Sequence, residues 1–347
     1  MLLTSAVISG LGLGSMYGLI ALGFHVTYVV SNTVNFSQGS AMMLGAVLGY
    51  TFAVTLGWPL PLAAMTALAA CALAGAVIER TLVRPFAERG SNAWLMATVA
   101  GGIVLDNLVL FTFGWPLLLA AMTALAACAL AGAVIERTLV RPFAERGSNA
   151  WLMATVAGGI VLDNLVLFTF GKEPRGFPSV LATKPVQIFG AGVYPLQLVI
   201  PVAGIAIAIL LQVVFSRTRL GKALLAVVQN PDAAKLMGIN VRLAVTVSFM
   251  ISTALAGLAG LLIAPLFSVH SDMGTLFGIK AFAVAILGGI SSAWGVMLAG
   301  LLYGLIEALV TAFAGSTYTQ IIAFTVVILA LAAMPNGLFG RAAAKKV

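Results

Sequence analysis

Continuous apolar stretches of membrane-spanning length dominate this chain and constrain its fold more than any other feature. A helix needs roughly 20 apolar residues to cross a bilayer, and several stretches approach or exceed that length. Their apolarity is continuous rather than alternating, which excludes the two-residue period of an outer-membrane barrel. Charged residues make up only 8% of the chain, against roughly 25% in soluble domains. The sequence therefore predicts an all-α fold, a polytopic bundle of transmembrane helices.

The spans are expected within a single transmembrane domain that covers residues 1–347. Lys and Arg concentrate in the cytoplasmic loops of membrane proteins. One topology of about ten spans places the arginine-bearing loop 80–92, its copy 137–149, the segment 216–243 and the basic C-terminal tail on the cytoplasmic side. The expected spans are 8–30, 40–57, 59–79, 93–113, 115–135, 150–170, 193–215, 244–266, an interrupted helix at 281–313, and 317–334.

A tandem repeat places residues 57–113 directly before a nearly identical copy, 114–170, and the two differ only where Pro61 faces Leu118. Repeats that build a fold keep a shared pattern while their letters drift. The near-identity therefore indicates a recent duplication or an error in assembling the sequence, and one copy fewer leaves 290 residues. Each copy is predicted to contribute a helix, a basic cytoplasmic loop and a returning helix. We expect one copy to occupy the position in the bundle and the other to pack peripherally.

The cytoplasmic segment 216–243 contains the signals of a short helix. Asn230 can cap a helix, Pro231 suits its first turn, Asp232 complements the positive end of its dipole, and Gly238 is a natural stop. We predict a helix over 231–237. Two interpretations remain open, since the segment can dock in a partner's groove or serve as a linker helix on the membrane surface.

Two stretches interrupt the apolar pattern with small or polar residues. LGGISSAWGVMLAG, 287–300, breaks a helix, and irregular backbone at membrane depth is tolerated where it is buried or lines a cavity. It either lines a substrate path or packs closely through small residues, as GLLYG, GSMYG and GAVLG also suggest. In VNFSQG, 34–39, the polar side chains can bind a polar solute or satisfy the backbone of their own turn.

Titratable and nucleophilic residues are few. Glu307 is the one acidic residue well inside a late span, and such a group is costly unless it is paired or faces water. We expect a functional or network role for it, against a position near the membrane surface. His25 and His270 are isolated, so we predict no catalytic and no metal-binding residue. No G-x-x-x-x-G-K-[ST] phosphate loop occurs in the sequence, so the energy for any transport must come from a partner or an ion gradient.

Several separated motifs resemble one transporter family. GKALLAVVQNPDAAKLMGINV and the later KAFAVAILGGISSAWGVMLAGLLYGLIEAL are similar to the second half of permeases of the branched-chain amino acid ABC transporter family. GLGLGSMYGLIALGFHVTYVVSNTVNFSQGSAMMLGA resembles the opening of that family, and ERTLVRPF and MPNGLFGR also fit. The resemblance covers essentially the whole chain except one copy of the repeat. It departs at Ser37 and Gln38, where alanine and histidine are frequent.

The resemblance implies a multi-pass subunit of the bacterial inner membrane that dimerises with itself or a related permease. Separate cytoplasmic ATPases would drive it and an extracytoplasmic binding protein would supply the solute. The chain itself would bind no cofactor, with ATP and Mg²⁺ on the ATPase. Branched-chain amino acids are the first expected substrate, and urea or short amides the second. The alternative is a secondary transporter or channel driven by an ion gradient, for which the sequence offers few titratable groups: Asp106, Asp163 and Glu307.

The resemblance also implies two sets of site residues. The segment around Asn230 to Gly238 would be the coupling helix. The candidate ATPase-coupling residues are Arg219, Gly221, Lys222, Asn230, Pro231, Asp232, Ala233, Ala234, Lys235 and Gly238. The candidate substrate-path residues are Asn35, Phe36, Gln38, Gly288, Gly289, Ser291, Ser292 and Glu307.

Overall fold

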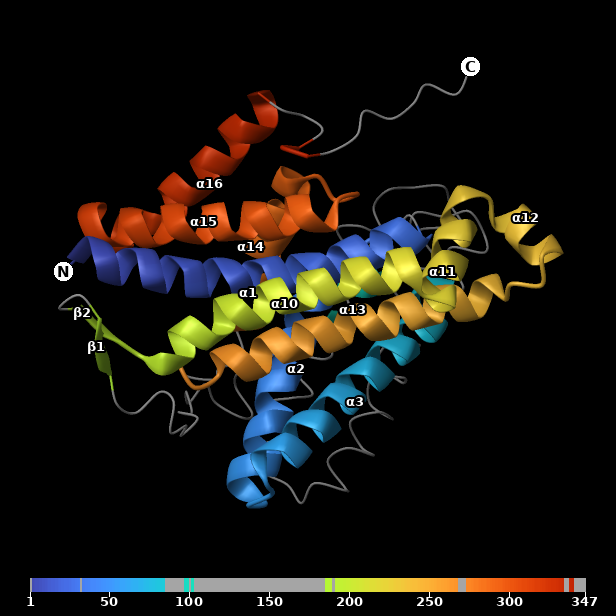
Figure 1. Ribbon diagram of the computed structural model, residues 1–347, viewed down its shortest axis with the longest axis horizontal. Helices are drawn as coiled ribbons and strands as arrows, with labels where there is room; N and C mark the ends of the chain where they lie inside the picture. The colour runs from blue at the N-terminus through green and yellow to red at the C-terminus, as the bar shows by residue number, and fades with distance from the viewer. Residues whose placement is uncertain are drawn as a thin grey trace, which may run out of the picture. The chain divides into compact units, whose positions relative to one another are not determined.

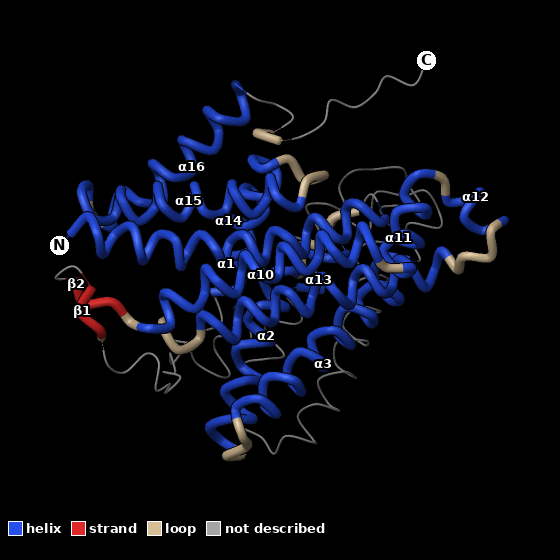
Figure 2. The backbone as a smooth tube through the Cα atoms, viewed as in Figure 1, coloured by secondary structure: helices blue, strands red, loops and turns tan. Residues whose placement is uncertain are grey.

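The protein is described from a computed structural model, shown in Figure 1 as a ribbon. Helices make up most of the described chain, and short loops and one strand pair make up the rest (Figure 2). The residues that the structure describes are 2–31, 33–84, 97–99, 101, 102, 185–188, 191–267, 273–333 and 337–339.

The described elements confirm the predicted all-α membrane fold. Among the described residues, five helices are long and apolar enough to cross a membrane: α1, α3 with its continuation, α10, α13 and α15. The elements in chain order are α1 (Leu2–Ser31), α2 (Gln38–Tyr50), η1 (Thr51–Thr55), α3 (Leu60–Ile78), η2 (Glu79–Val83), β1 (Val186–Ile188), β2 (Ala191–Val193), α10 (Pro195–Arg217), α11 (Arg219–Gln229), α12 (Pro231–Leu236), α13 (Val241–Ile263), α14 (Met273–Gly288), α15 (Ala293–Ala314) and α16 (Ser316–Ala333), where η marks a π-helix.

The chain divides into two compact units, and we describe each by itself. Unit 1 comprises Met1–Asn32, Pro178–Ala244 and Ile279–Val347. Unit 2 comprises Thr33–Phe177 and Val245–Gly278. The chain therefore passes from one unit to the other within α13 and again within α14.

In unit 1, α1 packs against α10 and α15 through a seam of glycines. Gly10 and Gly14 of α1 face Gly304 and Gly300 of α15, and a Cβ added to any of the four would overlap the opposite backbone. Helices approach this closely in membranes when small residues line the contact, because association there depends on van der Waals packing. The packing predicted for GSMYG and GLLYG is confirmed.

In unit 2, α2 and α3 pack against the part of α13 that follows Ala244, again through close contacts at glycines. Gly45 of α2 lies against Gly257, and Gly75 of α3 lies against Phe249 and Thr253. The Cys71 side chain is also buried in this packing, with its Sγ 3.8 Å from the Ala41 carbonyl oxygen. GAVLG, which contains Gly45, therefore packs closely as predicted.

The interrupted span at 281–313 is two helices joined by a turn. α14 ends at Gly288 and α15 begins at Ala293. Gly288, at the end of α14, lies against Gly295 near the start of α15. Lys280, earlier in α14, pairs with Glu307, later in α15, so the two helices run antiparallel. The break is confirmed, and its cause is a helix hairpin rather than a gap within one spanning helix.

The first copy of the repeat supplies α3 and the short described stretch at 97–102. Both lie within unit 2, where the Thr98 hydroxyl accepts a hydrogen bond from the Phe36 N–H at 3.3 Å. The second copy, 114–170, lies outside the described residues. Its peripheral packing therefore stays a prediction, as does the single-domain interpretation of the whole chain.

Candidate functional site

The segment 216–243 of unit 1, predicted to be cytoplasmic, forms two successive helices that are capped by their own sequence. The Thr218 hydroxyl accepts the Gly221 N–H at 3.0 Å at the start of α11. The Asn230 side chain accepts the N–H groups of Asp232 and Ala233, at 3.1 and 3.0 Å, at the start of α12. These bonds satisfy donors that a helix N-terminus leaves free. The helix predicted over 231–237 is confirmed and ends one residue earlier, at Leu236.

The C-terminal end of α12 reverses the chain and exposes apolar side chains. Gly238 has a φ of 78°, a conformation that glycine adopts without the Cβ penalty. Leu236 is 88% exposed and Met237 81% exposed. Ala234 is buried instead, so its side chain packs inside the protein. Gly221 is buried too, against Val214 and Phe215.

The remaining predicted coupling residues of α11 and α12 are exposed. They are Arg219, Lys222, Asn230, Pro231, Asp232, Ala233, Lys235 and Gly238. Lys235 and Asp232 form an exposed ion pair at 3.0 Å, and such pairs add little stability. The structure therefore divides the predicted set into an exposed face and two packing residues.

The turn between α14 and α15 contains the second group of predicted residues. Gly289 has a φ of 82°, and the Ser292 N–H donates to its carbonyl at 2.8 Å. The Ser292 hydroxyl caps α15 by accepting the Gly295 N–H at 3.2 Å. Ser291 is exposed, and Gly288 is buried against Gly295. Four of the predicted substrate-path residues therefore build this turn.

Two other parts of unit 1 hold the same turn. His25 of α1 approaches the Ile290 carbonyl oxygen with its Nδ1 at 2.7 Å. The Leu338 N–H donates to the Leu287 carbonyl at 2.7 Å, and Gly337 lies against Gly289. The closing motif MPNGLFGR thus covers the turn with its three described residues. These contacts are those of close packing, the second interpretation of LGGISSAWG.

The segment VNFSQG lies at the start of α2 in unit 2, and all of its residues except Val34 and Phe36 are buried. Both the nitrogen and the oxygen of the Gln38 side-chain amide form hydrogen bonds to one residue of α13. Its Nε2 donates to the Ser252 carbonyl at 2.7 Å, and its Oε1 accepts the Ser252 hydroxyl at 2.9 Å. Gln38 therefore joins two helices. The half-buried Phe36 is held by its backbone bond to Thr98.

Asn35 differs from Gln38 because half of its amide is unused. Its Oδ1 accepts the N–H and the hydroxyl of Ser37, which closes a turn of the kind asparagine favours. Its side chain is fully buried, and its Nδ2 has no hydrogen-bond partner within the described ranges. Buried donors are rarely left unpaired. Asn35 thus presents the unit's one orphaned amide donor within the part of the chain that the structure describes.

Glu307 forms a buried ion pair in unit 1 with a residue that the sequence analysis missed. Lys280 Nζ lies 2.5 Å from Glu307 Oε1 and 3.4 Å from the Tyr17 hydroxyl. The other carboxylate oxygen, Oε2, and the hydroxyl of Tyr303 are buried without hydrogen-bond partners in the described residues. Glu307 is therefore paired, as expected of a network residue, and its place in the substrate path stays a prediction. Lys280 could have been suspected because it is the one charged residue within the apolar helix α14.

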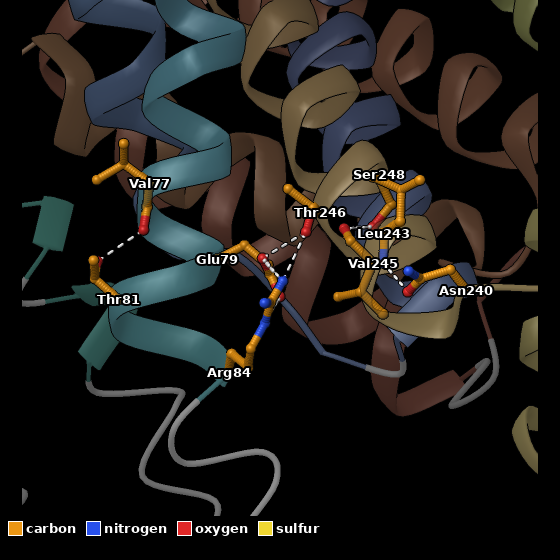
Figure 3. Close-up of polar contacts among 9 residues, drawn as sticks. All are labelled: Val77, Glu79, Thr81, Arg84, Asn240, Leu243, Val245, Thr246 and Ser248. Carbon is orange, nitrogen blue, oxygen red and sulfur yellow. Dashed lines mark hydrogen bonds and ion pairs between the residues drawn. The ribbon is translucent and has the colours of Figure 1, made fainter.

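A second buried carboxylate, Glu79, lies at the end of α3 in unit 2 and was also missed (Figure 3). Arg84 donates from Nε to Glu79 Oε1 at 3.0 Å and from Nη2 to Oε2 at 2.7 Å. The Thr246 hydroxyl of α13 donates to Oε2 at 2.8 Å and accepts from Arg84 Nη2 at 2.8 Å. The three side chains, which we call the Glu79 network, form a closed set of hydrogen bonds between α3 and α13.

The chemistry of these groups is that of packing and recognition. No cluster of three His, Cys, Asp or Glu residues occurs among the residues whose placement is described. The fold is that of a polytopic membrane protein, and the site residues described above serve helix packing, capping and recognition.

The comparisons with known proteins identify the family. The chain belongs to the branched-chain amino acid transport system permease component family, whose profile matches residues 6–109 and 97–331. It is 28% identical to the high-affinity branched-chain amino acid transport system permease protein LivH of Escherichia coli (strain K12), over 98% of this chain and 96% of LivH. It is 29% identical to the corresponding protein BraD of Pseudomonas aeruginosa, over 98% of this chain and 97% of BraD.

A more distant similarity reaches a permease named for another solute. The galactose/methyl galactoside import permease protein MglC of Haemophilus influenzae is 30% identical over 58% of this chain and 60% of its own length. The family and the apolar helices together make this chain a multi-pass protein of the inner membrane.

Proposed function

We propose that this chain is the transmembrane permease subunit of an ABC importer that translocates branched-chain amino acids. The LivH and BraD relatives, which align over nearly the whole chain, are named as permeases for those solutes. One structural observation carries the proposal furthest. It is the capped helix α12, which ends in the exposed side chains of Leu236 and Met237.

The exposed tip of α12 suits docking on a cytoplasmic ATPase. Short helices bind partner proteins by inserting apolar side chains into a groove. Leu236 and Met237 supply that contact, while the caps at Asn230 and Gly238 hold the helix in shape before the partner arrives. A preformed helix lowers the ordering cost of binding. Ala233 and Lys235 lie on the exposed face and would complete the contact.

The energy and the partners follow from this assignment. Two ATPase subunits would hold the ATP and Mg²⁺, and this chain would bind no cofactor of its own. A second permease, identical or homologous, would complete the membrane pathway, and an extracytoplasmic binding protein would deliver the solute. ATP binding would favour one of two openings of the permease, because a ligand shifts an equilibrium only through its different affinity for the two states.

Asn35 is the residue we propose to contact the solute. Its orphaned Nδ2 is a buried donor that an amino-acid carboxylate or carbonyl oxygen can satisfy. Gln38, Gly288, Gly289 and Ser292 are used in helix contacts and in a turn, so they would shape the path rather than bind the solute.

Reconstitution in liposomes tests the proposal. The chain, its ATPases and its binding protein are assembled, and uptake of labelled leucine is measured with ATP inside. We expect ATP-dependent uptake that unlabelled isoleucine and valine inhibit and that urea, acetamide and galactose do not. Uptake that runs on a pH or sodium gradient without ATP would instead identify a secondary transporter and end the proposal.

A paired substitution tests the role of α12. Leu236→Ser with Met237→Ser removes the apolar tip, and we expect loss of ATPase binding and of uptake while the purified subunit stays folded. The control is Leu220→Ser, an exposed apolar residue of the neighbouring α11. Equal ATPase binding by both variants would show that the tip is not the docking contact.

A further inference from the structure

The Glu79 network joins the end of α3 to the start of α13, the helix that follows α12 in the chain. We propose that Glu79, Arg84 and Thr246 are positioning residues that make α3 follow α13 when the ATPases move α12. The proposal rests on the function proposed above, because it needs an ATPase-driven movement of α12.

The backbone at the end of α3 is shaped to build this network. Residues five apart lie on different faces of an α-helix, where neighbours are three or four apart. η2 is a π-helix, in which the Arg84 N–H donates to the carbonyl of Glu79, five residues earlier. This wider turn brings the Arg84 side chain over the Glu79 carboxylate, as the close-up in Figure 3 shows. Single π turns are rare and occur frequently at functional sites.

The contacts make the network a firm connection. Both oxygens of the Glu79 carboxylate are hydrogen-bonded, and the carboxylate is only 2% exposed. A bidentate pair between arginine and carboxylate fixes orientation as well as distance. The Thr246 hydroxyl completes the network with one hydrogen bond to Arg84 and one to Glu79. Ile78, Val83 and Phe249 form an apolar cluster among the same elements.

Thr246 lies where movement of α12 enters the membrane helix. Four residues separate the end of α12 from Val241, where α13 begins, and the Asn240 side chain caps α13 by accepting the Leu243 N–H at 3.0 Å. Thr246 is in the second turn of that helix, about 8 Å along its axis from Val241 at the rise of an α-helix. A helix transmits a displacement over such a length as a rigid element. The network is the polar attachment through which α3 receives it.

The repeat provides a matched control for this role. Glu136 and Arg141 are the residues of the second copy that correspond to Glu79 and Arg84. Glu79→Gln and Glu136→Gln are therefore the same change in the same local sequence. A deletion would not serve, because removing either copy leaves chains that differ only by Pro61 or Leu118.

The experiment measures coupling in the complete reconstituted importer. Leucine uptake and ATP hydrolysis are recorded together, and their ratio is compared among the unaltered chain, Glu79→Gln, Glu136→Gln, Thr246→Val and Thr246→Ser. We expect Glu79→Gln and Thr246→Val to lower the uptake per ATP by about fivefold or more, the low end of typical coupling between sites. We expect Thr246→Ser, which keeps the hydroxyl, and Glu136→Gln to retain the ratio of the unaltered chain.

The ratio separates positioning from stability. A purely structural network would reduce the amount of assembled importer and leave the uptake per ATP of the assembled fraction unchanged, and that result would overturn the proposal. An equal loss in Glu136→Gln would overturn it too. If Glu79→Gln fails to assemble, the Thr246 pair still decides, because valine matches threonine in shape. Absence of ATP-driven uptake in the unaltered chain would instead refute the function proposed above.

Discussion

Glu79 in unit 2 and Glu307 in unit 1 are both buried carboxylates, and their charges are paired in different ways. Glu79 finds its arginine within the same short segment, and both of its oxygens are hydrogen-bonded. Glu307 finds Lys280 on another helix and keeps one oxygen without a partner in the described chain. Arg84 remains 26% exposed, whereas Lys280 is only 11% exposed. We infer that the first pair can reach water if broken and the second cannot.

The largest effect is expected from breaking the pair in unit 1. Lys280→Met leaves the Glu307 carboxylate buried and unpaired, and we expect a loss of about 3–5 kcal/mol in the free energy of unfolding. Combining it with Glu307→Leu should recover most of that loss, because an apolar pair of similar volume carries no desolvation cost. Unfolding of the purified protein in detergent measures both. A double variant as unstable as the single one would contradict the account.

A smaller loss is expected at Glu79. Glu79→Ala frees Arg84, whose partly exposed guanidinium can turn toward water, so we expect a cost of about 2–3 kcal/mol. Glu136→Ala is the control in the second copy, and we expect little change. The same unfolding measurement applies. A larger cost at Glu136 than at Glu79 would show that the second copy holds the structural position.

Thr246→Val isolates the hydroxyl of the Glu79 network. The shape of the side chain is kept, and two hydrogen bonds to charged groups are lost. We expect a destabilisation of about 1–2 kcal/mol, with Thr246→Ser close to the unaltered protein. No difference between the two variants would mean that the hydroxyl contributes nothing to stability.

The smallest effect is expected at Tyr303, beside Glu307. Its hydroxyl is buried without a partner in the described residues, while its ring packs edge-on against Tyr17 at a centroid distance of 5.4 Å. Tyr303→Phe keeps the ring, so we expect a change within about 0.5 kcal/mol or a slight gain. A clear loss of stability would reveal that the hydroxyl is hydrogen-bonded, for instance to a buried water. The polar groups around Glu307 would then be more fully hydrogen-bonded, as they are around Glu79.

Local features of the sequence were predicted well because their causes are local. The caps at Asn230 and Gly238 and the break at Gly289 follow from residues a few positions apart. The glycine seam of α1 and α15 was predicted as close packing, since small residues at helical spacing have that use in membranes. The sequence could not say which helix each glycine meets.

The polar contacts of the candidate site were predicted poorly. Neither Lys280 nor Thr246 was singled out in the sequence. Gln38 was left between binding a solute and satisfying its own turn, yet it bonds Ser252, 214 positions further along. The pairing of Glu79 with Arg84 could not be predicted from the sequence spacing for another reason. It depends on a π-helix, and an α-helix would separate the two residues.

The sequence by itself determined that this protein spans a membrane, that the segment 216–243 contains a capped helix, and that the chain resembles a permease family. The length of an apolar stretch, a helix cap and the order of motifs can each be recognised in the sequence without knowing which residues are in contact in the fold. Only the tertiary structure decided which polar groups are paired and which are orphaned. A buried charge is stable only beside its partner, and that partner comes from whichever helix the packing brings close.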